Sequence, residues 1–527
     1  MKKLVTTVLC GLVTLNVLAQ TAPGRPKLVV GIVVDQMRTD YIEFLRDYFG
    51  ESGFRKLMKE GMYLRDVDFK VKKLDAANAT AMLYTGAYPS ENGVPAALIY
   101  DNADKKITPA LADSKTLGNF TNDSYTPDKL RLTTISDELT VNGAGLGQVY
   151  AFSSDPQQSI IMAGHAGSGA FWINNTNGNW ATSGYYGSLP SAVSSRNSSS
   201  SLSARIDTMQ WRPSMAPDKM LGLPKHKAAA PFRHTFPKSD RNVYIRFAGT
   251  PLANREVTDV AIECLRTMNV GQGGQAIDML NLGYTVAPYK YVKDGDPRAE
   301  LTDAYLRLDK ELGRLFEAIN RYVGADNTMI WLSSTGYYDD AVLEERRYRL
   351  PGGDFSVKRA VSLLNSYLSA QYGNDRYVDA FKSGQVYFNH NLIEQKNLRL
   401  NEVIADARSF LMKMSGIADA YTIDEILSPR TPEEESLRLS IDPKTGGDIV
   451  VAFSPGWTVT DDTEYTPVTH TVRETPVLTP AFILAPDVKA QVISTPVDAT
   501  VLAPTVAGIL RIRSPNGAVS KPLLINN

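Results

Sequence analysis

Asp35 is the residue whose position best suits it for chemistry. It follows directly after residues 27–34, KLVVGIVV, a continuous apolar and β-branched run typical of a strand buried on both faces. Open α/β sheets bind their ligands at the carboxyl ends of such strands. Asp35 is therefore predicted to lie at a ligand-binding edge. The alternative is that its carboxylate caps a helix or accepts backbone N–H groups.

Histidine and cysteine show none of the spacings that hold a metal. The histidines form no H-x-x-x-H or comparable pair, so we expect structural or surface roles for His165, His226, His234, His390 and His470. Of the two cysteines, Cys10 lies in the apolar N-terminal segment and Cys264 has no intrachain partner. An internal disulfide and a cysteine-based metal site are therefore excluded from the mature chain.

The segments that would position these residues alternate between strands and helices. Apolar residues from Leu301 to Val323 repeat at helical spacing, and a strand is predicted over 328–332. Two more strands are predicted over 447–453 and 481–484, and a last helix over 500–512. Residues from about 102 to 241 and from about 343 to 442 interrupt this alternation. Both stretches are predicted to be insertions on one α/β core that extends from residue 21 to residue 527.

Composition and the N-terminus limit where the chain acts and what it binds. Residues 1–20 are predicted to be a secretory signal peptide, because two lysines precede an apolar run from Leu4 to Leu18 and small Ala19 stands before Gln20. We expect a periplasmic or secreted protein with no transmembrane segment after the signal peptide. The formal net charge of −1 provides no positive field for nucleic acid.

Short motifs follow one another in a distinctive order along the mature chain. They are VVDQMR at 33–38, GF at 53–54, YTG at 84–86, AGH at 163–165, GAFW at 169–172, AYLRLD at 304–309, PGW at 455–457 and PVDAT at 496–500. In this order they resemble the periplasmic alkaline phosphatases that use a threonine nucleophile, relatives of the type I phosphodiesterase/nucleotide pyrophosphatases. The resemblance implies an alkaline-phosphatase-like three-layer α/β sandwich, with a largely parallel central sheet and cap insertions above its C-terminal edge.

The resemblance also implies which residues should hold the phosphate, and most are replaced. Members of the family hold two zinc ions with aspartates and histidines, and a hydroxyl nucleophile lies between the ions. Counted back from Tyr84, the nucleophile position falls on Ala76, which has no oxygen. The phosphate-binding asparagine falls on Ala97, and the Lys-x-Arg pair falls on Asp155 and Gln157, which are neutral or acidic.

The zinc ligands are replaced in the same way. The Asp-x-x-x-His motif falls on Pro288 and Val292, the Asp-His-Gly motif on Ser334-Thr335-Gly336, and the last histidine on Leu478. Asp35 is the one ligand position that the resemblance leaves intact. We therefore expect no cofactor, because one carboxylate is far from the four ligands that zinc takes.

A count shifted by one residue leaves an alternative open. Asp75 then takes the nucleophile position, and with Asp35, Asp339 and Asp340 it could form an oxygen-only site for magnesium, manganese or calcium. Thr80 is the nearest hydroxyl to Ala76, but one helical turn separates them by about 6 Å. Its expected role is packing.

The aromatic residues of the first predicted insertion allow two interpretations. They could stack on a sugar or a peptide, or form part of the core, and the core is favoured. The residues are Phe171, Trp172, Trp180, Tyr185 and Tyr186.

The expected function is that of a catalytically inactive family member in the periplasm, which binds an envelope protein, a glycan or a small ligand, or has a purely structural role. Its vestigial pocket would contain Asp35, Asp75, Ala76, Thr80, Asp155, Gln157, Ser334 and Thr335. The alternative function is hydrolysis of phosphoesters at a rebuilt site that contains zinc or magnesium.

Overall fold

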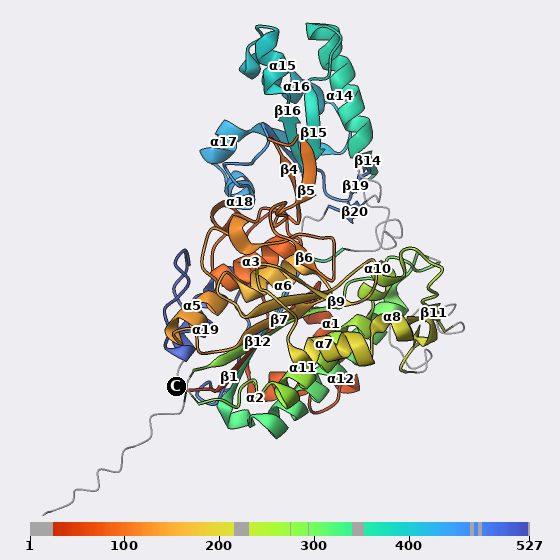
Figure 1. Ribbon diagram of the computed structural model, residues 1–527. Coiled ribbons are helices and arrows are strands. Elements are labelled where there is room, and N and C mark those ends of the chain that lie inside the picture. Colours follow the sequence, from red (N-terminus) through yellow and green to blue (C-terminus); the bar gives the residue numbers. More distant parts are fainter. Residues whose placement is uncertain are drawn as a thin grey trace, which may run out of the picture.

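A ten-stranded sheet forms the centre of the molecule (Figure 1). The computed structural model describes residues 25–215, 231–274, 276–293, 295–339, 352–463, 468–472 and 477–524, so the predicted signal peptide lies outside the described residues. In spatial order the strands are β22 (Gln491–Ile493), β2 (Met62–Leu64), β21 (Ala481–Leu484), β13 (Thr328–Ser334), β1 (Leu28–Asp35), β12 (Asp278–Thr285), β7 (Val149–Ser153), β8 (Gly169–Ile173), β9 (Trp180–Ser183) and β6 (Gly118–Asn119).

Five neighbouring strands at the centre of this sheet run parallel. They are β13, β1, β12, β7 and β8, and β1 pairs with both β12 and β13 along its length. Pairing with β21 on one side and with β9 on the other is antiparallel. The carboxyl ends of the parallel strands therefore meet at one edge of the sheet, where Asp35 ends β1.

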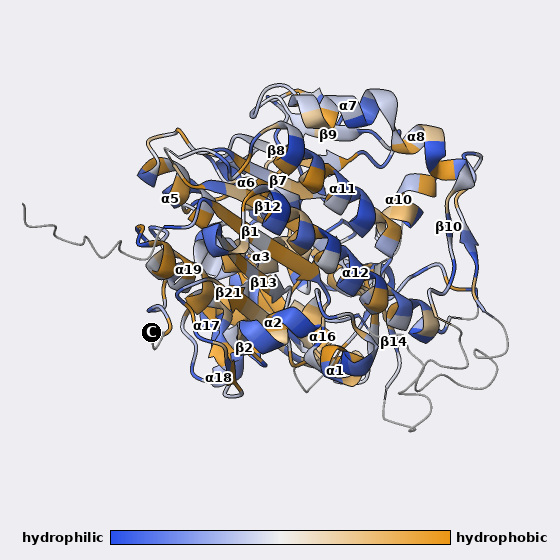
Figure 2. Cartoon of the chain, turned by 90° about the horizontal axis from the view of Figure 1, so that it is seen from below, coloured by the Kyte–Doolittle hydropathy of each residue, from blue (hydrophilic) through white to orange (hydrophobic). Residues whose placement is uncertain are grey.

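Helices cover both faces of the sheet, as the motif resemblance implied. Alternate residues of β1 belong to different apolar cores: Val30 and Ile32 pack on one side, and Val29 and Val33 pack on the other. The first core includes α1 (Thr39–Phe44), α2 (Phe54–Glu60), α7 (Ser191–Ser199), α11 (Pro251–Thr267) and α12 (Arg298–Tyr322). The second includes α3 (Ala76–Thr85), α5 (Ile135–Asn142), α6 (Pro156–Ala163) and α19 (Leu502–Leu510). In Figure 2 the apolar strands lie between helices that are hydrophilic on their outer sides.

The predicted elements of the core are present. The strand over 27–34 is β1, the strand over 328–332 is β13, and the strand over 481–484 is β21. The helical repeat from Leu301 to Val323 lies in α12, and the last helix is α19. Among the described helices, none combines the length and apolar character needed to span a bilayer.

The stretch from about 102 to 241 differs from the expected insertion. It supplies β6, β7, β8 and β9 to the central sheet, so much of it is part of the core. It was predicted to be an insertion because it interrupts the alternation of strands and helices, but its short strands are stabilised by pairing with neighbours that lie far away in the sequence. Smaller pieces lie outside the sheet, such as the hairpin of β4 (Leu98–Asp101) and β5 (Lys106–Pro109) and the hairpin of β10 (Gln210–Trp211) and β11 (His234–Thr235).

The second interrupting stretch forms a cap with its own apolar core at the top of Figure 1. Its four-stranded sheet has the order β15 (Val378–Lys382), β16 (Gln385–Phe388), β18 (Ile449–Phe453) and β17 (Ile417–Thr422). The strand predicted over 447–453 is β18 and therefore belongs to the cap. The other elements of the cap are α14 (Val357–Tyr372), α15 (His390–Gln395), α16 (Leu400–Leu411), α17 (Ile423–Leu427), α18 (Pro432–Ser440) and the sheet of β14 (Asp354–Ser356), β19 (Thr458–Asp461) and β20 (Val468–Thr471).

Candidate functional site

Asp35 lies at the carboxyl end of β1, next to the residues that follow β13. Thr335 donates its hydroxyl to Asp35 Oδ1 at 3.0 Å, and its Oγ1 accepts the backbone N–H of Gln36 at 2.9 Å. Burial raises the pKa of Asp35 to about 7, although hydrogen bonds from Tyr337 and Thr335 oppose the shift. Side-chain hydroxyls therefore bind the Asp35 carboxylate, where the sequence suggested backbone N–H groups.

Asp75 is the N-cap of α3. Its Oδ1 accepts the backbone N–H groups of Ala77 and Asn78 at 3.0 Å, and its Oδ2 accepts that of Ala97 at 2.6 Å. Asn78 closes a capping box by accepting the backbone N–H of Asp75 at 2.9 Å. Both carboxylate oxygens of Asp75 are therefore engaged in holding the backbone.

Asp155 and Gln157, at the positions of the family's phosphate clamp, have structural partners as well. Asp155 caps α6 by accepting the backbone N–H of Gln158 at 2.8 Å. Gln157 donates to the backbone oxygen of Ala97 at 3.0 Å and accepts the backbone N–H of Leu111 at 3.1 Å. Asp155 thus stabilises the start of α6, and Gln157 ties it to the segments that contain Ala97 and Leu111.

Ala76 and Thr80 lie one turn apart on α3. Ala76 is the first residue of the helix and has no hydroxyl to present. Thr80 is fully buried, and its hydroxyl donates to the backbone oxygen of Ala76 at 2.6 Å. The packing role expected of Thr80 agrees with this position.

The end of β13 contributes Ser334, and the segment after it contributes Thr335, Tyr337 and Asp339. Asp339 forms a reciprocal pair with Gln36, because its backbone N–H donates to Gln36 Oε1 at 2.8 Å and its carboxylate accepts Gln36 Nε2 at 3.3 Å. Asp340, the fourth aspartate of the alternative metal site, lies outside the described residues. Ser334 is buried at the end of β13.

Several aspartates influence one another electrostatically around Asp35, and Lys290 pairs with Asp339 at 3.9 Å. The charges of Asp339 and Asp155 contribute to raising the pKa of Asp35, and the charge of Asp75 adds to the effect of burial in raising that of Asp155. Burial also raises the pKa of the Tyr337 phenol, as do the carboxylates of Asp35, Asp339 and Asp75. These effects link Asp35, Asp75, Asp155 and Asp339 electrostatically; the sequence had placed Asp35, Asp75 and Asp339 in one candidate site.

The two zinc ions that the family implies do not fit the described residues. Pro288, Val292 and Leu478 have no side-chain donor atom at all, and the hydroxyl of Thr335 is already bonded to Asp35. Within the described ranges, no group of three or more His, Cys, Asp or Glu side chains is arranged to hold a metal ion. The described residues therefore do not supply the ligands of a dinuclear zinc centre.

The described histidines lie away from Asp35 or take part in structural contacts. His165 contacts Asp137 and the backbone oxygen of Leu130, His234 contacts Glu300, and His390 contacts Asp448. Burial lowers the pKa of His470 to about 4, with a contribution from nearby Lys73. His226 lies outside the described residues.

The aromatic residues of the first stretch divide between core and surface. Phe171, Trp172 and Trp180 are buried in the core, which was the favoured interpretation. Tyr186 is partly buried and donates its hydroxyl to the backbone oxygen of Gly164. Tyr185 is 40% exposed.

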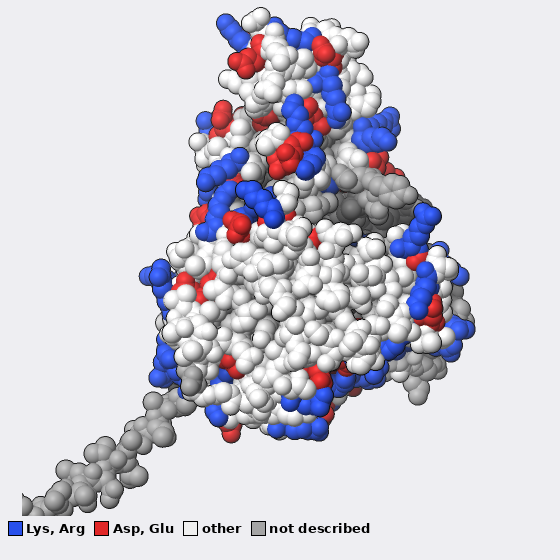
Figure 3. Space-filling model, viewed as in Figure 1, with Lys and Arg blue, Asp and Glu red and all other residues white. Residues whose placement is uncertain are grey.

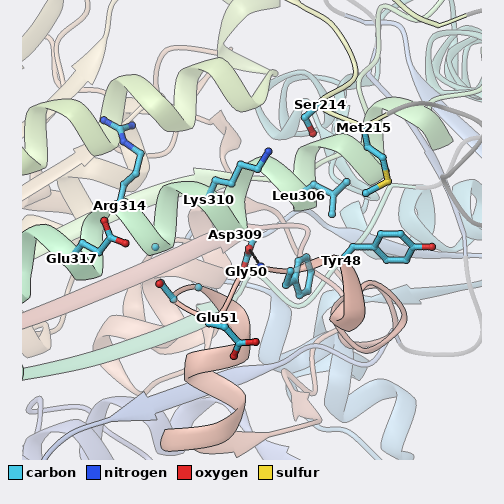
Figure 4. A pocket seen from close by; sticks show the side chains of 14 residues that line it. Tyr48, Gly50, Glu51, Ser214, Met215, Leu306, Asp309, Lys310, Arg314 and Glu317 are labelled. Atoms are coloured by element: carbon cyan, nitrogen blue, oxygen red, sulfur yellow. Dashed lines mark hydrogen bonds between the residues drawn. The ribbon is translucent and has the colours of Figure 1, made fainter.

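A pocket of about 530 Å³ lies elsewhere, between α12 and the loop at residues 48–53 (Figure 4). Within it, Asp309 accepts the backbone N–H of Gly50 at 2.8 Å, so this carboxylate has a structural partner. Arg314 is paired with Asp259 and Glu311. None of the predicted site residues lines this pocket, and its charges are mixed.

Sequence reasoning missed Tyr337 and the capping roles of Asp75 and Asp155. The two helix N-caps could have been predicted from the sequence, because Asp75 stands three residues before Asn78 at a helix start and Asp155 precedes Pro156. No sequence pattern indicated the role of Tyr337, since only the path of the chain after β13 brings its phenol to Asp35.

A three-layer α/β/α domain with a cap near the carboxyl ends of its parallel strands defines an alkaline-phosphatase-like hydrolase fold. Residues 29–476 match the model of the type I phosphodiesterase/nucleotide pyrophosphatase family, so the chain belongs to this family. The motifs at the edge of the sheet had already suggested this relationship.

Several relatives match this chain over almost its whole length. Alkaline phosphatase PafA of Elizabethkingia meningoseptica is 28% identical over 95% of this chain and 94% of the relative. A protein of Myroides odoratus named calcium-transporting ATPase is 26% identical, with 99% and 98% covered. Alkaline phosphatase PhoV of Synechococcus elongatus is 26% identical, with 96% and 94% covered.

The similarity extends to the three-dimensional structure. A crystal structure of wild-type PafA superposes with a TM-score of 0.83 at 26% identity, covering 95% of this chain and 99% of that one. These comparisons support membership of a phosphoester-hydrolase family. They favour the alternative function, a hydrolase, over the main expectation of an inactive protein.

Proposed function

We propose that this chain uses its phosphatase-like pocket for binding and not for hydrolysis. The observation that carries the proposal is the carboxylate of Asp75 at the N-terminus of α3, directly before Ala76. A helix N-terminus binds anions through its free N–H groups and its dipole. Here Asp75 already accepts the N–H groups of Ala77 and Asn78, so an internal anion occupies the place that a phosphate would need.

The charge of the pocket supports the same proposal. A phosphoryl group needs positive partners during transfer. Asp155 and Gln157 stand at the clamp positions, and three other aspartates influence Asp35 directly or through one another. Such a pocket repels phosphate and sulfate, so its ligand in the periplasm or outside the cell is expected to be neutral or cationic.

A second candidate function is hydrolysis of phosphoesters with a divalent metal. The family match and the names of the relatives support it. Asp35, Asp75 and Asp339 would supply oxygen ligands for a hard cation such as Mg²⁺ or Mn²⁺, and water would be the nucleophile. Asp75 would have to give up its cap of α3 to do so.

One experiment separates the two functions. The purified protein is analysed for bound metals and is assayed with p-nitrophenyl phosphate and bis(p-nitrophenyl) phosphate in added Zn²⁺, Mg²⁺ or Mn²⁺. For a binding protein we expect no stoichiometric metal and no hydrolysis above that of an identically prepared Asp35→Asn variant.

The Asp35→Asn comparison also controls for contaminating phosphatases. Hydrolysis at least tenfold above that of the variant, with an exposed-site control such as Asp47→Asn fully active, would establish the hydrolase and overturn the binding proposal. Asp47 is exposed in the short helical turn over Arg46–Tyr48 and is none of the predicted site residues.

A further inference from the structure

A broad surface of the core is almost free of charged side chains (Figure 3). It lies over β6, β9 and α7, at the outer edge of the central sheet, and Figure 2 shows α7 and β9 at the periphery of the molecule. We define the neutral face as residues 117–120 together with residues 166–204. From residue 166 to residue 204, Arg196 is the single charged residue.

The one cation of the neutral face, Arg196, is paired with carboxylates of the helix beneath it, α11. Arg196 contacts Glu256 at 2.8 Å and Asp259 at 3.0 Å on α11, so its guanidinium is held against the core. Lys115 and Asp123 carry charges that flank the face. The face itself therefore presents hydroxyls, amides and aromatic rings.

Phe120 lies at one end of this face with an exposed side chain and a strained backbone. Its backbone has φ of 62°, a region that bulky residues rarely adopt, and its side chain is 51% exposed. The amide side chains of Asn174 and Asn177 donate to its backbone oxygen at 3.0 and 3.4 Å, which holds this conformation. Burial of Phe120 does not explain the strain, because the ring remains at the surface.

Tyr185 lies at the other end of the edge formed by β6 and β9. It is 40% exposed, and its hydroxyl donates to the backbone oxygen of His165 at 3.0 Å, which fixes the ring. Gly184, which precedes Tyr185, donates its backbone N–H to the backbone oxygen of Leu117 at 2.8 Å, so Tyr185 lies near the start of β6, whereas Phe120 follows the end of β6. Leu117, 82% exposed, lies between them.

The surroundings of these rings offer hydrogen bonds without charge. Exposed hydroxyls and amides occur after β8, after β9 and along α7. They belong to Asn175, Thr176, Asn177, Ser188, Ser191, Ser194, Ser195, Ser198 and Ser199. Fixed aromatic rings among adaptable Ser and Asn side chains form a surface that can bind with little loss of side-chain entropy.

This composition disfavours other occupants. Protein interface cores are rich in apolar residues and depleted in serine, whereas the exposed apolar side chains of this face, Leu117, Phe120 and Tyr185, lie among many serines. An anionic membrane surface or a nucleic acid would require lysines and arginines, which the face lacks. A neutral carbohydrate fits, because its apolar C–H faces stack on aromatic rings and its hydroxyls exchange hydrogen bonds with uncharged groups.

We infer that the neutral face is a binding surface for an uncharged glycan, with Phe120 and Tyr185 as its stacking residues. It lies at the edge of the sheet and does not include the aspartates around Asp35. Its test is therefore independent of whether the pocket binds or hydrolyses.

The test uses native electrophoresis of the full mature chain in gels that contain dextran, laminarin or soluble starch, with heparin as the anionic comparison. We expect at least one neutral polysaccharide to retard the protein and heparin to have no effect. The double substitution Phe120→Ala with Tyr185→Ala is expected to weaken the retardation at least fivefold. The double substitution Phe120→Trp with Tyr185→Trp is expected to preserve it.

Phe44→Ala is the matched control, because Phe44 is 53% exposed but lies on α1, outside the neutral face. The inference is overturned if no neutral polysaccharide retards the protein, if heparin alone does, or if the double alanine variant binds as well as Phe44→Ala. Sedimentation velocity provides a further check. A concentration-dependent dimer that the same double alanine variant abolishes would assign the face to a second copy of the chain and overturn the glycan proposal.

Discussion

At the scale of single residues, the pocket shows how one carboxylate changes what a helix terminus can bind. The start of α3 is held by Asp75, and the start of α6 is held by Asp155. In each case the side chain accepts N–H groups that an external anion would otherwise use. Under the proposed function, Ala76, Asp155 and Gln157 take the positions at which the family resemblance implies a hydroxyl and basic residues, while Asp75 and Asp155 hold the ends of the helices.

The helix N-cap that Asp75 forms at α3 leads to a prediction about stability. Asp75→Ala removes the acceptor of three backbone N–H groups, so the free energy of unfolding is expected to fall by about 1–3 kcal/mol. Urea unfolding followed by circular dichroism measures this difference. Asp47→Ala, which removes an exposed carboxylate without a cap hydrogen bond, is expected to change stability by less than about 0.5 kcal/mol. Equal stability of the two variants would show that the N-cap hydrogen bonds of Asp75 contribute nothing to the free energy of unfolding.

At the scale of elements, the loop between β3 (Val67–Asp68) and α3 inserts a lysine beneath the cap. Burial lowers the pKa of Lys73 to about 7; nearby Lys382 adds to the shift and Asp461 opposes it. The ammonium lies 5.7 Å from the ring centre of Phe453, and a side chain at Gly384 would collide with it. The cap and the core therefore enclose this cation together.

The lowered pKa of Lys73 predicts that the stability of the folded chain depends on pH. Its pKa is lower in the folded chain than its usual value of 10.5, so between about pH 7 and pH 10.5 the unfolded chain holds more protons. The stability of the folded state should therefore rise with pH across this window. Lys73→Met should remove the rise and stabilise the protein at pH 7 by about 2–4 kcal/mol.

Chemical denaturation at several pH values tests this prediction. Lys72→Met is the control, because Lys72 is exposed and forms only a surface ion pair with Glu433. The control should keep the same pH dependence as the unaltered chain. If Lys73→Met keeps it too, Lys73 is not the titrating group.

At the scale of the whole molecule, the cap and the core are joined by paired charges as well as by the chain. Arg131 of the core forms two hydrogen bonds with Asp442 of the cap, at 2.9 and 2.5 Å. The carboxylate of Asp442 is almost fully buried, with a side-chain exposure of 3%. A buried carboxylate that loses its cation is costly, so this pair holds the cap in place.

Removing the cation should loosen the cap without unfolding the sheet. In Arg131→Met we expect amide hydrogen exchange to quicken over residues 432–447, while protection in β1, β12 and β13 stays unchanged. Arg399→Met is the matched control, since Arg399 is 83% exposed and pairs with Glu402 within one helix. Unchanged exchange in the cap of Arg131→Met would contradict this role of the pair.

The sequence by itself was enough to predict the layers of the core. The apolar run before Asp35 and the repeat from Leu301 to Val323 predicted β1 and α12, because burial on both faces and burial on one face leave different periodicities. The absence of a donor atom from the side chains of Ala76, Pro288 and Val292 was also readable, since such side chains can neither attack phosphorus nor bind metal in any conformation.

Only the tertiary structure decided what the remaining polar residues do. Asp75 could be a metal ligand or a helix cap, and this choice depends on Ala97, which the fold brings to its second oxygen. The strands of residues 102–241 belong to the sheet because distant strands supply their hydrogen bonds, and local composition does not record such pairing. The neutral face is likewise a product of folding, because it joins residues 117–120 to a segment about fifty residues further along the chain.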